Sequence, residues 1–328
     1  MNNKVTISAP GKLMLFGEHA VVYNKPCIVT AVNQRLSIIA SHNDEPVFKL
    51  NAPDVEVTNY NKLMTHLGEG EIPKGAKFVE IATRNFFKKY ESVIPAHAGI
   101  QLATITQFKS TFGFGSSSAS AVCTIKALAE IYKPDLTEKE IFDIAYQTVL
   151  DVQVLGSGFD LGAAIYGGTL YFLTGGIRIE PLNIKSLPLI VGYTGVKADT
   201  ATIVREVKAR FENRQEELNK IYDSIEKIVE AARVAFKDSD LKKLGELMNS
   251  NQTLLEQLGV STNKLSSMIN ASRNAGAFGA KLSGAGGGDC MIALAPDNKR
   301  TAVEKAIQNA GGQVLKVQVN TEGARVEK

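Results

Sequence analysis

Cysteine, tryptophan and long apolar runs are scarce or missing in this chain, and each absence excludes a class of protein. The 328 residues include 3 cysteines and no tryptophan. Cys27, Cys123 and Cys290 lie far apart among apolar or small residues, which predicts reduced core thiols rather than a disulfide framework or a cysteine-rich metal site. No apolar stretch reaches the length of a membrane span, and no apolar leader follows the polar first residues. The sequence therefore predicts a cytoplasmic protein without a membrane partner.

An excess of charge of one sign is also missing. The 37 Lys and Arg residues and the 34 Asp and Glu residues leave a formal net charge of +3. The basic residues are scattered among acidic ones, so the sequence contains no positive block of the kind that indicates nucleic-acid binding. With 44% hydrophobic residues the chain can bury a large core, and its length predicts two domains.

A run of small residues before a helical pattern is the most informative feature that is present. The run comprises Gly113, Phe114, Gly115, Ser116, Ser117, Ser118 and Ala119. Its two glycines allow main-chain N–H groups to approach phosphate oxygens, and the helix that follows presents unpaired N–H groups and a positive dipole end. It lacks the Lys that follows the last glycine of a Walker loop. By itself the run fits either a phosphate loop of another kind or a turn with a helix cap.

Periodicity predicts alternating strands and helices in the first half of the chain and a helix-rich second half. The first half has expected strands at 5–9, 27–40, 99–105, 169–173 and 187–193, and expected helices at 77–90, 117–132 and 138–150. The second half has helices at 200–236 with a break near Asn213, 241–258, 263–276 and 298–310, and strands at 279–282, 289–294 and 313–319. The βα alternation after the break at 181–187 is typical of a ferredoxin-like domain. We therefore expect an α+β protein with domains at 1–185 and 186–328.

Two further stretches accompany the central run, one near each end of the sequence. The first is Pro10-Gly11-Lys12-Leu13-Met14-Leu15-Phe16-Gly17-Glu18-His19-Ala20-Val21-Val22-Tyr23, and the last is Lys281-Leu282-Ser283-Gly284-Ala285-Gly286-Gly287-Gly288-Asp289-Cys290. In order and separation, the three resemble the signature motifs of the GHMP kinases, the superfamily of galactokinase, homoserine kinase, mevalonate kinase and phosphomevalonate kinase. The resemblance spans nearly the whole chain. It implies the two-domain GHMP kinase fold, with an N-terminal α/β domain, a C-terminal ferredoxin-like domain and an active site in the cleft between them.

The resemblance also assigns the two candidate catalytic residues. Asp160 resembles the carboxylate that these kinases place beside the acceptor oxygen, where it can accept or orient a proton. Lys12 matches the lysine that pairs with this carboxylate and steadies developing charge. From the residues alone, Asp160 fits a helix cap equally well, and Lys12 fits a solvated strand end. ATP is the implied phosphate donor, with Mg²⁺ as the implied metal.

The expected metal ligands match the family only in part. Ser117 matches the serine that ligates magnesium in relatives, with Ser116 and Ser118 as close rivals, although each also fits a helix cap. Mevalonate kinases place a second ligand, a Glu, eleven residues before the catalytic Asp, and this chain has Val149 there. Asp151 is the nearest carboxylate, but a solvated role fits it equally. Magnesium keeps several waters in such sites, so one serine with the ATP phosphates is a workable set.

Residues of the first motif and of a later helix start are expected on the acceptor side. His19 matches a mevalonate kinase residue near the acceptor carboxylate, Glu18 is expected to hold the loop or the substrate, and Thr200 matches a threonine that contacts the acceptor. A buried structural His and an N-cap at Thr200 are the alternatives. Lys197 offers an extra cation for a phosphorylated acceptor. The third motif, with Gly284, Ala285, Gly286 and Gly287, is expected to approach the triphosphate or shape the cleft.

Within the superfamily the residues point in two directions. The stretch from Gly17 to Tyr23 looks most like mevalonate kinase, whereas Gly156-Ser157-Gly158-Phe159-Asp160 and the Asp289-Cys290 pair look more like phosphomevalonate kinase. The acceptor-side His19 carries more weight, so the expected activity is ATP-dependent conversion of mevalonate to 5-phosphomevalonate. Phosphomevalonate kinase is the alternative, and a non-catalytic GHMP-like protein that binds a metabolite is a further one. A homodimer is expected by analogy with family members.

Overall fold

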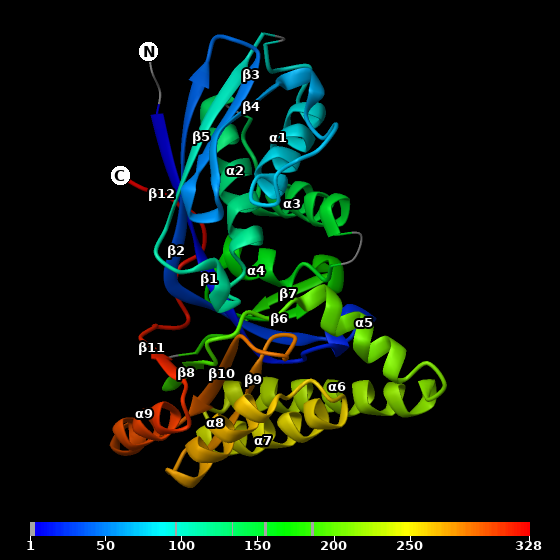
Figure 1. The fold of residues 1–328 in the computed structure, drawn as a ribbon, viewed down its shortest axis with the longest axis vertical. Coiled ribbons are helices and arrows are strands. Elements are labelled where there is room, and N and C mark those ends of the chain that lie inside the picture. Colours follow the sequence, from blue (N-terminus) through cyan, green and yellow to red (C-terminus); the bar gives the residue numbers. More distant parts are fainter. Residues whose placement is uncertain (1–3, 96, 133, 154–155, 185–186) are drawn as a thin grey trace.

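Two sheets of different size organise the chain, as the computed structural model in Figure 1 shows. The structure describes residues 4–95, 97–132, 134–153, 156–184 and 187–328. The larger sheet lies in the upper part of the view with α1 to α4 beside it, and the smaller sheet lies below with α6 to α9. A buried hydrophobic cluster extends through both parts. Cys27, Cys123 and Cys290 are all buried free thiols, which confirms the expected core positions.

The larger sheet is mainly antiparallel. Its strands are β1 (Lys4–Phe16), β2 (Cys27–Asn43), β3 (Val47–Ala52), β4 (Val57–Leu63), β5 (Gly99–Thr106), β6 (Thr169–Leu173), β7 (Arg178–Pro181) and β12 (Arg325–Val326). The order is β12-β1-β2-β5-β3-β4, with β6 paired to β2 and β7; β3 and β5 run parallel. Its helices are α1 (Lys77–Lys89), α2 (Ser116–Tyr132), α3 (Glu138–Gln153) and α4 (Phe159–Tyr166). The β1–β2 register shifts between Pro10 and Gly11, where the first motif begins.

The smaller sheet has the ferredoxin-like strand order. Its strands are β8 (Leu189–Tyr193), β9 (Gly279–Ser283), β10 (Cys290–Leu294) and β11 (Gln313–Leu315). They lie in the order β11-β8-β10-β9 and all pair antiparallel, so the fourth strand of this half lies beside the first. The helices are α5 (Thr200–Arg210), α6 (Gln215–Lys237), α7 (Leu241–Gln257), α8 (Asn263–Asn274) and α9 (Arg300–Asn309). The predicted α+β class and the ferredoxin-like second half are confirmed.

Local capping explains where several helices begin. Glu140 Oε2 accepts hydrogen bonds from the N–H of Thr137 at 2.9 Å and from its hydroxyl at 2.7 Å, as a capping box requires. The predicted break near Asn213 is confirmed, because α5 ends at Arg210 and α6 starts at Gln215. The N-cap interpretation of Thr200 is wrong. Asp199 is the N-cap of α5 and accepts from the Thr202 N–H, because a carboxylate one residue earlier reaches the first-turn donors.

The chain returns to the first sheet after finishing the second. Strand β12 pairs antiparallel with β1, with Ile7 opposite Val326. The guanidinium of Arg35 donates to the carbonyls of Glu322 at 2.9 Å and Gly323 at 2.7 Å, which ties this last segment to β2. The expected boundary between 185 and 186 lies outside the described residues, and the two-domain division at that point stays a prediction.

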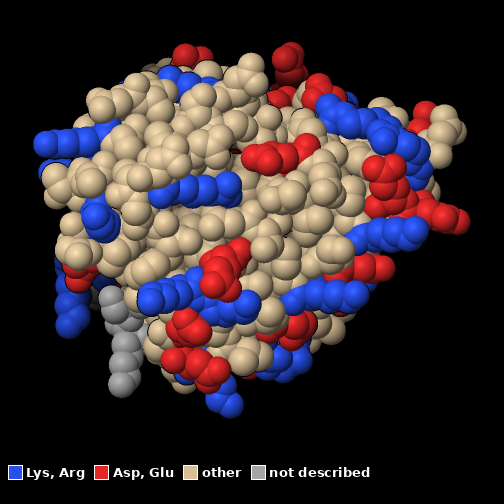
Figure 2. All heavy atoms as spheres, turned by 90° about the horizontal axis from the view of Figure 1, so that it is seen from below, with Lys and Arg blue, Asp and Glu red and all other residues tan. Residues whose placement is uncertain are grey.

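The surface shows mixed charge. On the face seen in Figure 2, basic and acidic side chains are interspersed, as their scatter along the sequence predicts. Among the helices of the described residues, none combines the length and the apolar character needed to cross a bilayer.

Candidate active site

The first and second motifs meet at Lys12. The backbone N–H of Lys12 donates to the carbonyl of Phe114 at 2.9 Å, and its side-chain Nζ donates to the carbonyl of Gly113 at 3.1 Å. A Cβ on Gly11 would lie 3.0 Å from Cβ of Phe114, so the glycine allows the two backbones to approach. Strand β1 is thereby fixed against the run of small residues that starts at Gly113.

Lys12 also pairs with the candidate catalytic carboxylate. Its Nζ lies 3.1 Å from Oδ1 of Asp160, and the two side chains are 12% and 30% exposed. The same ammonium lies 5.3 Å from the ring centre of Phe159. The N-cap of α4 is Gly158, so the helix-cap interpretation of Asp160 is wrong: its carboxylate faces Lys12 and not the helix start. A Cβ on Gly115 would lie 3.2 Å from Cε of Lys12, so the pair fits tightly under this glycine.

The expected phosphate loop has the geometry of an anion cradle. Gly113 and Gly115 adopt positive φ angles of 71° and 77°, and α2 begins directly afterwards at Ser116. Within the described chain, the N–H groups of Ser116, Ser117 and Ser118 have no hydrogen-bond acceptor. The first turn of a helix presents such N–H groups together with the positive end of the dipole, which suits a phosphate.

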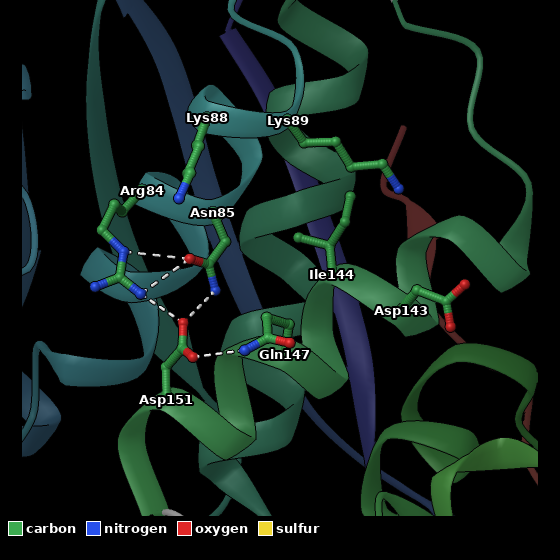
Figure 3. Close-up of a pocket in the computed structure, with 8 residues that line it drawn as sticks. All are labelled: Arg84, Asn85, Lys88, Lys89, Asp143, Ile144, Gln147 and Asp151. Atoms are coloured by element: carbon green, nitrogen blue, oxygen red, sulfur yellow. Dashed lines mark hydrogen bonds and ion pairs between the residues drawn. The ribbon is translucent and has the colours of Figure 1, made fainter.

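The Asp151 alternative for a metal ligand finds no support in the structure. As Figure 3 shows, Asp151 lies in a pocket of about 740 Å³ between α1 and α3, where it accepts from Arg84 at 2.5 Å, from Asn85 at 3.0 Å and from Gln147 at 2.6 Å. Val149 is buried, with its side chain against Gly156. No group of three or more metal-binding side chains occurs among the described residues. The expected role of the Ser117 hydroxyl, as the protein ligand of a Mg²⁺ that arrives with the nucleotide phosphates, stays a prediction.

Glu18 forms an ion pair that sequence reasoning missed. Its carboxylate bonds to Nζ of Lys281, which also donates to the carbonyl of Leu282 at 2.6 Å, and both charged side chains are fully buried. Burial raises the pKa of Glu18 and lowers the pKa of Lys281, and the attraction between the two opposes both shifts. The pair joins the first motif to β9. The sequence signal that could have found the pair is Lys281 itself, a charged residue in a strand, β9, whose other residues are small or apolar.

His19 also contacts the third motif. It is 5% exposed with a left-handed φ of 61°, and its Nε2 lies 2.8 Å from the carbonyl of Ala285. Burial lowers the pKa of His19, so the ring is neutral near pH 7. A neutral ring carries one N–H, and the carbonyl requires it at Nε2. The buried Nδ1 has no partner among the described residues and is left as an acceptor.

Three of the glycines of the third motif pack against other backbone or side chains. A Cβ on Gly288 would lie 2.7 Å from the carbonyl of Val196, one on Gly287 would lie 2.5 Å from Ile203, and one on Gly286 would overlap the carbonyl of Val260. A Cβ on Gly284 would meet open space. Ser283 also donates to the carbonyl of Met14 at 2.9 Å. These contacts favour the interpretation in which the glycines shape the site.

The acceptor-side residues of the second half lie on one short segment. We call residues 196–200 the acceptor segment; it follows β8, ends on the first residue of α5 and contains Lys197 and Thr200, which are both exposed. The N–H of Ala198 in this segment donates to Oδ1 of Asp289 at 2.8 Å. Asp289 in turn lies against Gly113 of the phosphate loop. The structure thus brings all three motifs and the acceptor segment to one place.

Fold and site together define a small-molecule kinase of the GHMP class. Residues 77–168 match the model of the GHMP kinases N terminal domain, and residues 232–313 match that of the GHMP kinases C terminal domain. A mevalonate kinase from Pyrococcus horikoshii is 37% identical over 335 residues, which cover 99% of this chain and 98% of the relative. The chain therefore belongs to the mevalonate kinase family of the GHMP kinases, which confirms the expected family and the ATP-dependent kinase class.

Solved structures agree with this assignment. The crystal structure of L. major mevalonate kinase in complex with R-mevalonate matches with a TM-score of 0.76 and 26% identity, covering 98% of this chain and 96% of that one. A Streptococcus pneumoniae phosphomevalonate kinase in complex with phosphomevalonate and AMPPNP matches with a TM-score of 0.80, covering 96% of this chain and 99% of that one. Its sequence is only 18% identical, so this second likeness concerns the fold alone.

Proposed function

We propose that the protein phosphorylates mevalonate with ATP to give 5-phosphomevalonate. The observation that carries the proposal is the Lys12–Asp160 pair, which lies directly beside the phosphate loop in a chain of the mevalonate kinase family. A partly exposed carboxylate next to an ammonium and an anion cradle is the arrangement that phosphoryl transfer to an alcohol requires.

In this proposal Asp160 and Lys12 act on the acceptor hydroxyl. The carboxylate of Asp160 orients the C5 hydroxyl and accepts its proton as the new oxygen–phosphorus bond forms and the bond to ADP breaks. Lys12 holds Asp160 in place and balances the charge that develops between acceptor and phosphate. The N–H groups of Ser116, Ser117 and Ser118 bind phosphate oxygens. Ser117 and the nucleotide would hold Mg²⁺, which would neutralise phosphate charge.

The acceptor side is built from the first motif and the acceptor segment. Thr200 and Lys197 are exposed and available to an acceptor, and Lys197 is the cation that a carboxylate or a phosphate would contact. His19 uses its one N–H on Ala285, so its direct role is to hold the third motif, while Nδ1 can accept from an acceptor hydroxyl. Glu18 is fully buried against Lys281, so we assign it to holding the loop rather than the substrate.

Phosphomevalonate remains the competing acceptor because of the Gly156–Asp160 stretch and Asp289. Sequence identity supports mevalonate, since 37% identity to the Pyrococcus horikoshii mevalonate kinase contrasts with 18% to the phosphomevalonate kinase structure. A location in the cytoplasm and a homodimer stay predictions. The three buried thiols support a reducing compartment, because each Cys is unpaired in the structure.

The test is ADP release from the purified protein with ATP and Mg²⁺, using mevalonate and 5-phosphomevalonate in parallel. Turnover with mevalonate alone supports the proposal, and turnover with 5-phosphomevalonate alone replaces it with the second activity. A thermal shift with ligand but no ADP release identifies a binding protein instead. Omitting Mg²⁺ is the control for the metal and should abolish release.

A further inference from the structure

Asp289 occupies a backbone conformation that favours glycine. Its φ is 52°, within a motif whose neighbours Gly284, Gly286 and Gly287 also have positive φ angles. A non-glycine residue in this left-handed region carries backbone strain, and such strain concentrates where the surrounding structure puts it to use. Asp adopts this region more readily than most residues, and the contacts of the Asp289 side chain show what it provides that a glycine cannot.

Asp289 makes three hydrogen bonds to the connection between β8 and α5. Its carbonyl accepts from the N–H of Thr194 at 2.9 Å, and its N–H donates to the carbonyl of Val196 at 2.8 Å. Because these two bonds use only the backbone, a glycine at this position could make them as well. The third is specific to the side chain, because Oδ1 accepts from the N–H of Ala198 at 2.8 Å. The side chain thereby extends the attachment to the middle of the acceptor segment, beside Lys197.

The other oxygen of the same carboxylate faces the phosphate loop. A Cβ on Gly113 would lie 2.6 Å from Oδ2 of Asp289, so the carboxylate packs directly on the backbone of that glycine. The next residue strengthens the same contact, since Sγ of Cys290 donates to the carbonyl of Phe112 at 3.3 Å. One buried side chain thus touches the loop assigned to ATP phosphates and the segment assigned to the acceptor.

The charge environment fits a fixed carboxylate. Burial raises the pKa of Asp289, while the Ala198 N–H and the charges of Lys12 and Lys197 act in the opposite direction. The two cations that act on this carboxylate belong to the phosphate side and the acceptor side of the site, respectively.

We propose that Asp289 is a positioning residue that sets the separation between the acceptor segment and the phosphate loop. This role rests on the proposed kinase activity. Asp289 forms no bond to the reacting atoms; it acts through Ala198 on one side and Gly113 on the other. Phosphoryl transfer requires the acceptor to bind with its oxygen in line with the phosphorus, so a shift of the acceptor segment weakens productive binding of the acceptor and raises its KM without affecting the chemistry of Asp160.

The test compares Asp289→Gly with Asp289→Asn in steady-state kinetics and thermal unfolding. Glycine removes the acceptor for Ala198 but relaxes the backbone, so the melting temperature should not fall while KM for the acceptor rises about tenfold or more. KM for ATP should change by less than about threefold, since the bonds of Lys12 to the phosphate loop remain. Asparagine keeps an oxygen for Ala198 and tolerates a positive φ, so it should restore kinetics to within about threefold of wild type.

Ser239→Gly is the matched control, because Ser239 also has a positive φ, 56°, but is exposed beyond the end of α6. It should leave every kinetic constant unchanged. The positioning role is overturned if Asp289→Gly keeps wild-type KM, if its melting temperature and kcat fall together with KM unchanged, or if Asp289→Asn is as impaired as the glycine variant. An active wild type with an unaffected Asp289→Gly overturns only this role, whereas a wild type silent with both acceptors overturns the proposed function as well.

Discussion

Two ion pairs each take one partner from the first motif, and they differ in exposure and in the elements that they join. Lys12 and Asp160 lie on elements of the first sheet's half, remain 12% and 30% exposed, and face the phosphate loop. Glu18 and Lys281 are both fully buried and join the first half to the second. Glu18 follows Lys12 by six positions, so one short motif contributes to both pairs. We call the partly exposed Lys12–Asp160 pair the open pair and the buried Glu18–Lys281 pair the closed pair.

The difference in exposure suits the two pairs to different roles. An open pair can exchange its partner for a substrate group because water compensates a carboxylate that is briefly unpaired. A closed pair has no such compensation, and removing one partner leaves a buried charge. The open pair is therefore suited to chemistry, and the closed pair to holding the two halves of the molecule at one separation.

The largest expected effect is on the open pair. Asp160→Asn keeps the size of the side chain but removes the proton acceptor, so kcat should fall about 10²- to 10⁴-fold. Because the side chain is 30% exposed, the melting temperature should change little. Coupled ADP assays and thermal unfolding measure both. Asp143→Asn, which alters a half-exposed pair with Lys139, is the control and should retain activity. Turnover of Asp160→Asn equal to wild type would exclude Asp160 from the reaction.

The closed pair should respond in stability. Lys281→Met leaves Glu18 buried without its cation, which should cost about 3–5 kcal/mol of unfolding free energy in denaturant titrations. The double variant with Glu18→Gln should recover part of this loss, because no unpaired charge remains.

Lys25→Met is the matched control for Lys281. Lys25 also joins the two halves, at 2.8 Å from Asp223 and 2.7 Å from Glu226 on α6, but it is 28% exposed. Its removal should cost less than about 1 kcal/mol. Equal losses for Lys25→Met and Lys281→Met would show that burial does not distinguish the two contacts.

A smaller effect is expected at the glycine above the open pair. Gly115→Ala forces a Cβ to a φ of 77°, at 3.2 Å from Cε of Lys12 and 3.4 Å from Oδ1 of Asp160. The strain should cost about 1 kcal/mol of stability, and the displaced pair should lower kcat by about tenfold. Gly70→Ala has a similar φ of 65° with open space around it, and so isolates the backbone cost. An unchanged kcat for Gly115→Ala would show that the pair tolerates displacement.

The smallest expected effect is the pH dependence of stability that comes from His19, the buried residue next to Glu18. Burial lowers the pKa of His19 below its ordinary value of 6.5, so the unfolded chain binds this proton first. The contribution of His19 to stability is present above pH 6.5 and is lost as the pH falls further, by at most about 1.4 kcal/mol per pH unit. His19→Gln keeps a donor for Ala285 and should flatten the fall of the melting temperature below pH 6.5. His66→Gln, at an exposed histidine, should not; identical profiles for wild type and His19→Gln would contradict the assignment.

Contiguous motifs made much of the site predictable. Lys12, Gly113 and Ser117 each lie in a short stretch whose neighbours carry the signal, and the resemblance linked them to Asp160. The Glu18–Lys281 pair was missed because its members are separated by 263 residues, and no local pattern links them. Asp289 was noticed as a difference between families, but its bond to Ala198 depends on a strained backbone that the sequence does not reveal.

The fold was predictable where periodicity is strong. Helix α1 and strand β5 lie within one residue of their expected bounds, because each buries one face. Strand β4 was missed since its sequence, Val57–Leu63, is mostly polar and lies at the edge of the sheet. Strand β12 has two residues, too few to show an alternating pattern, and its pairing depends on a partner from the other end of the chain.

Strand β12 completes the larger sheet, and it is synthesised long after its partner β1. Ribosomes release β1 and Arg35 long before residues 322–326 exist, so the newly made first half exposes an open strand edge. The guanidinium of Arg35 then also lacks the carbonyls of Glu322 and Gly323. Arg35 keeps its two hydrogen bonds to Ser8, so the open strand edge is the main feature that such a nascent chain offers to chaperones or to neighbouring chains. Once residues 322–326 have been synthesised, β12 can pair with β1 and cover this edge.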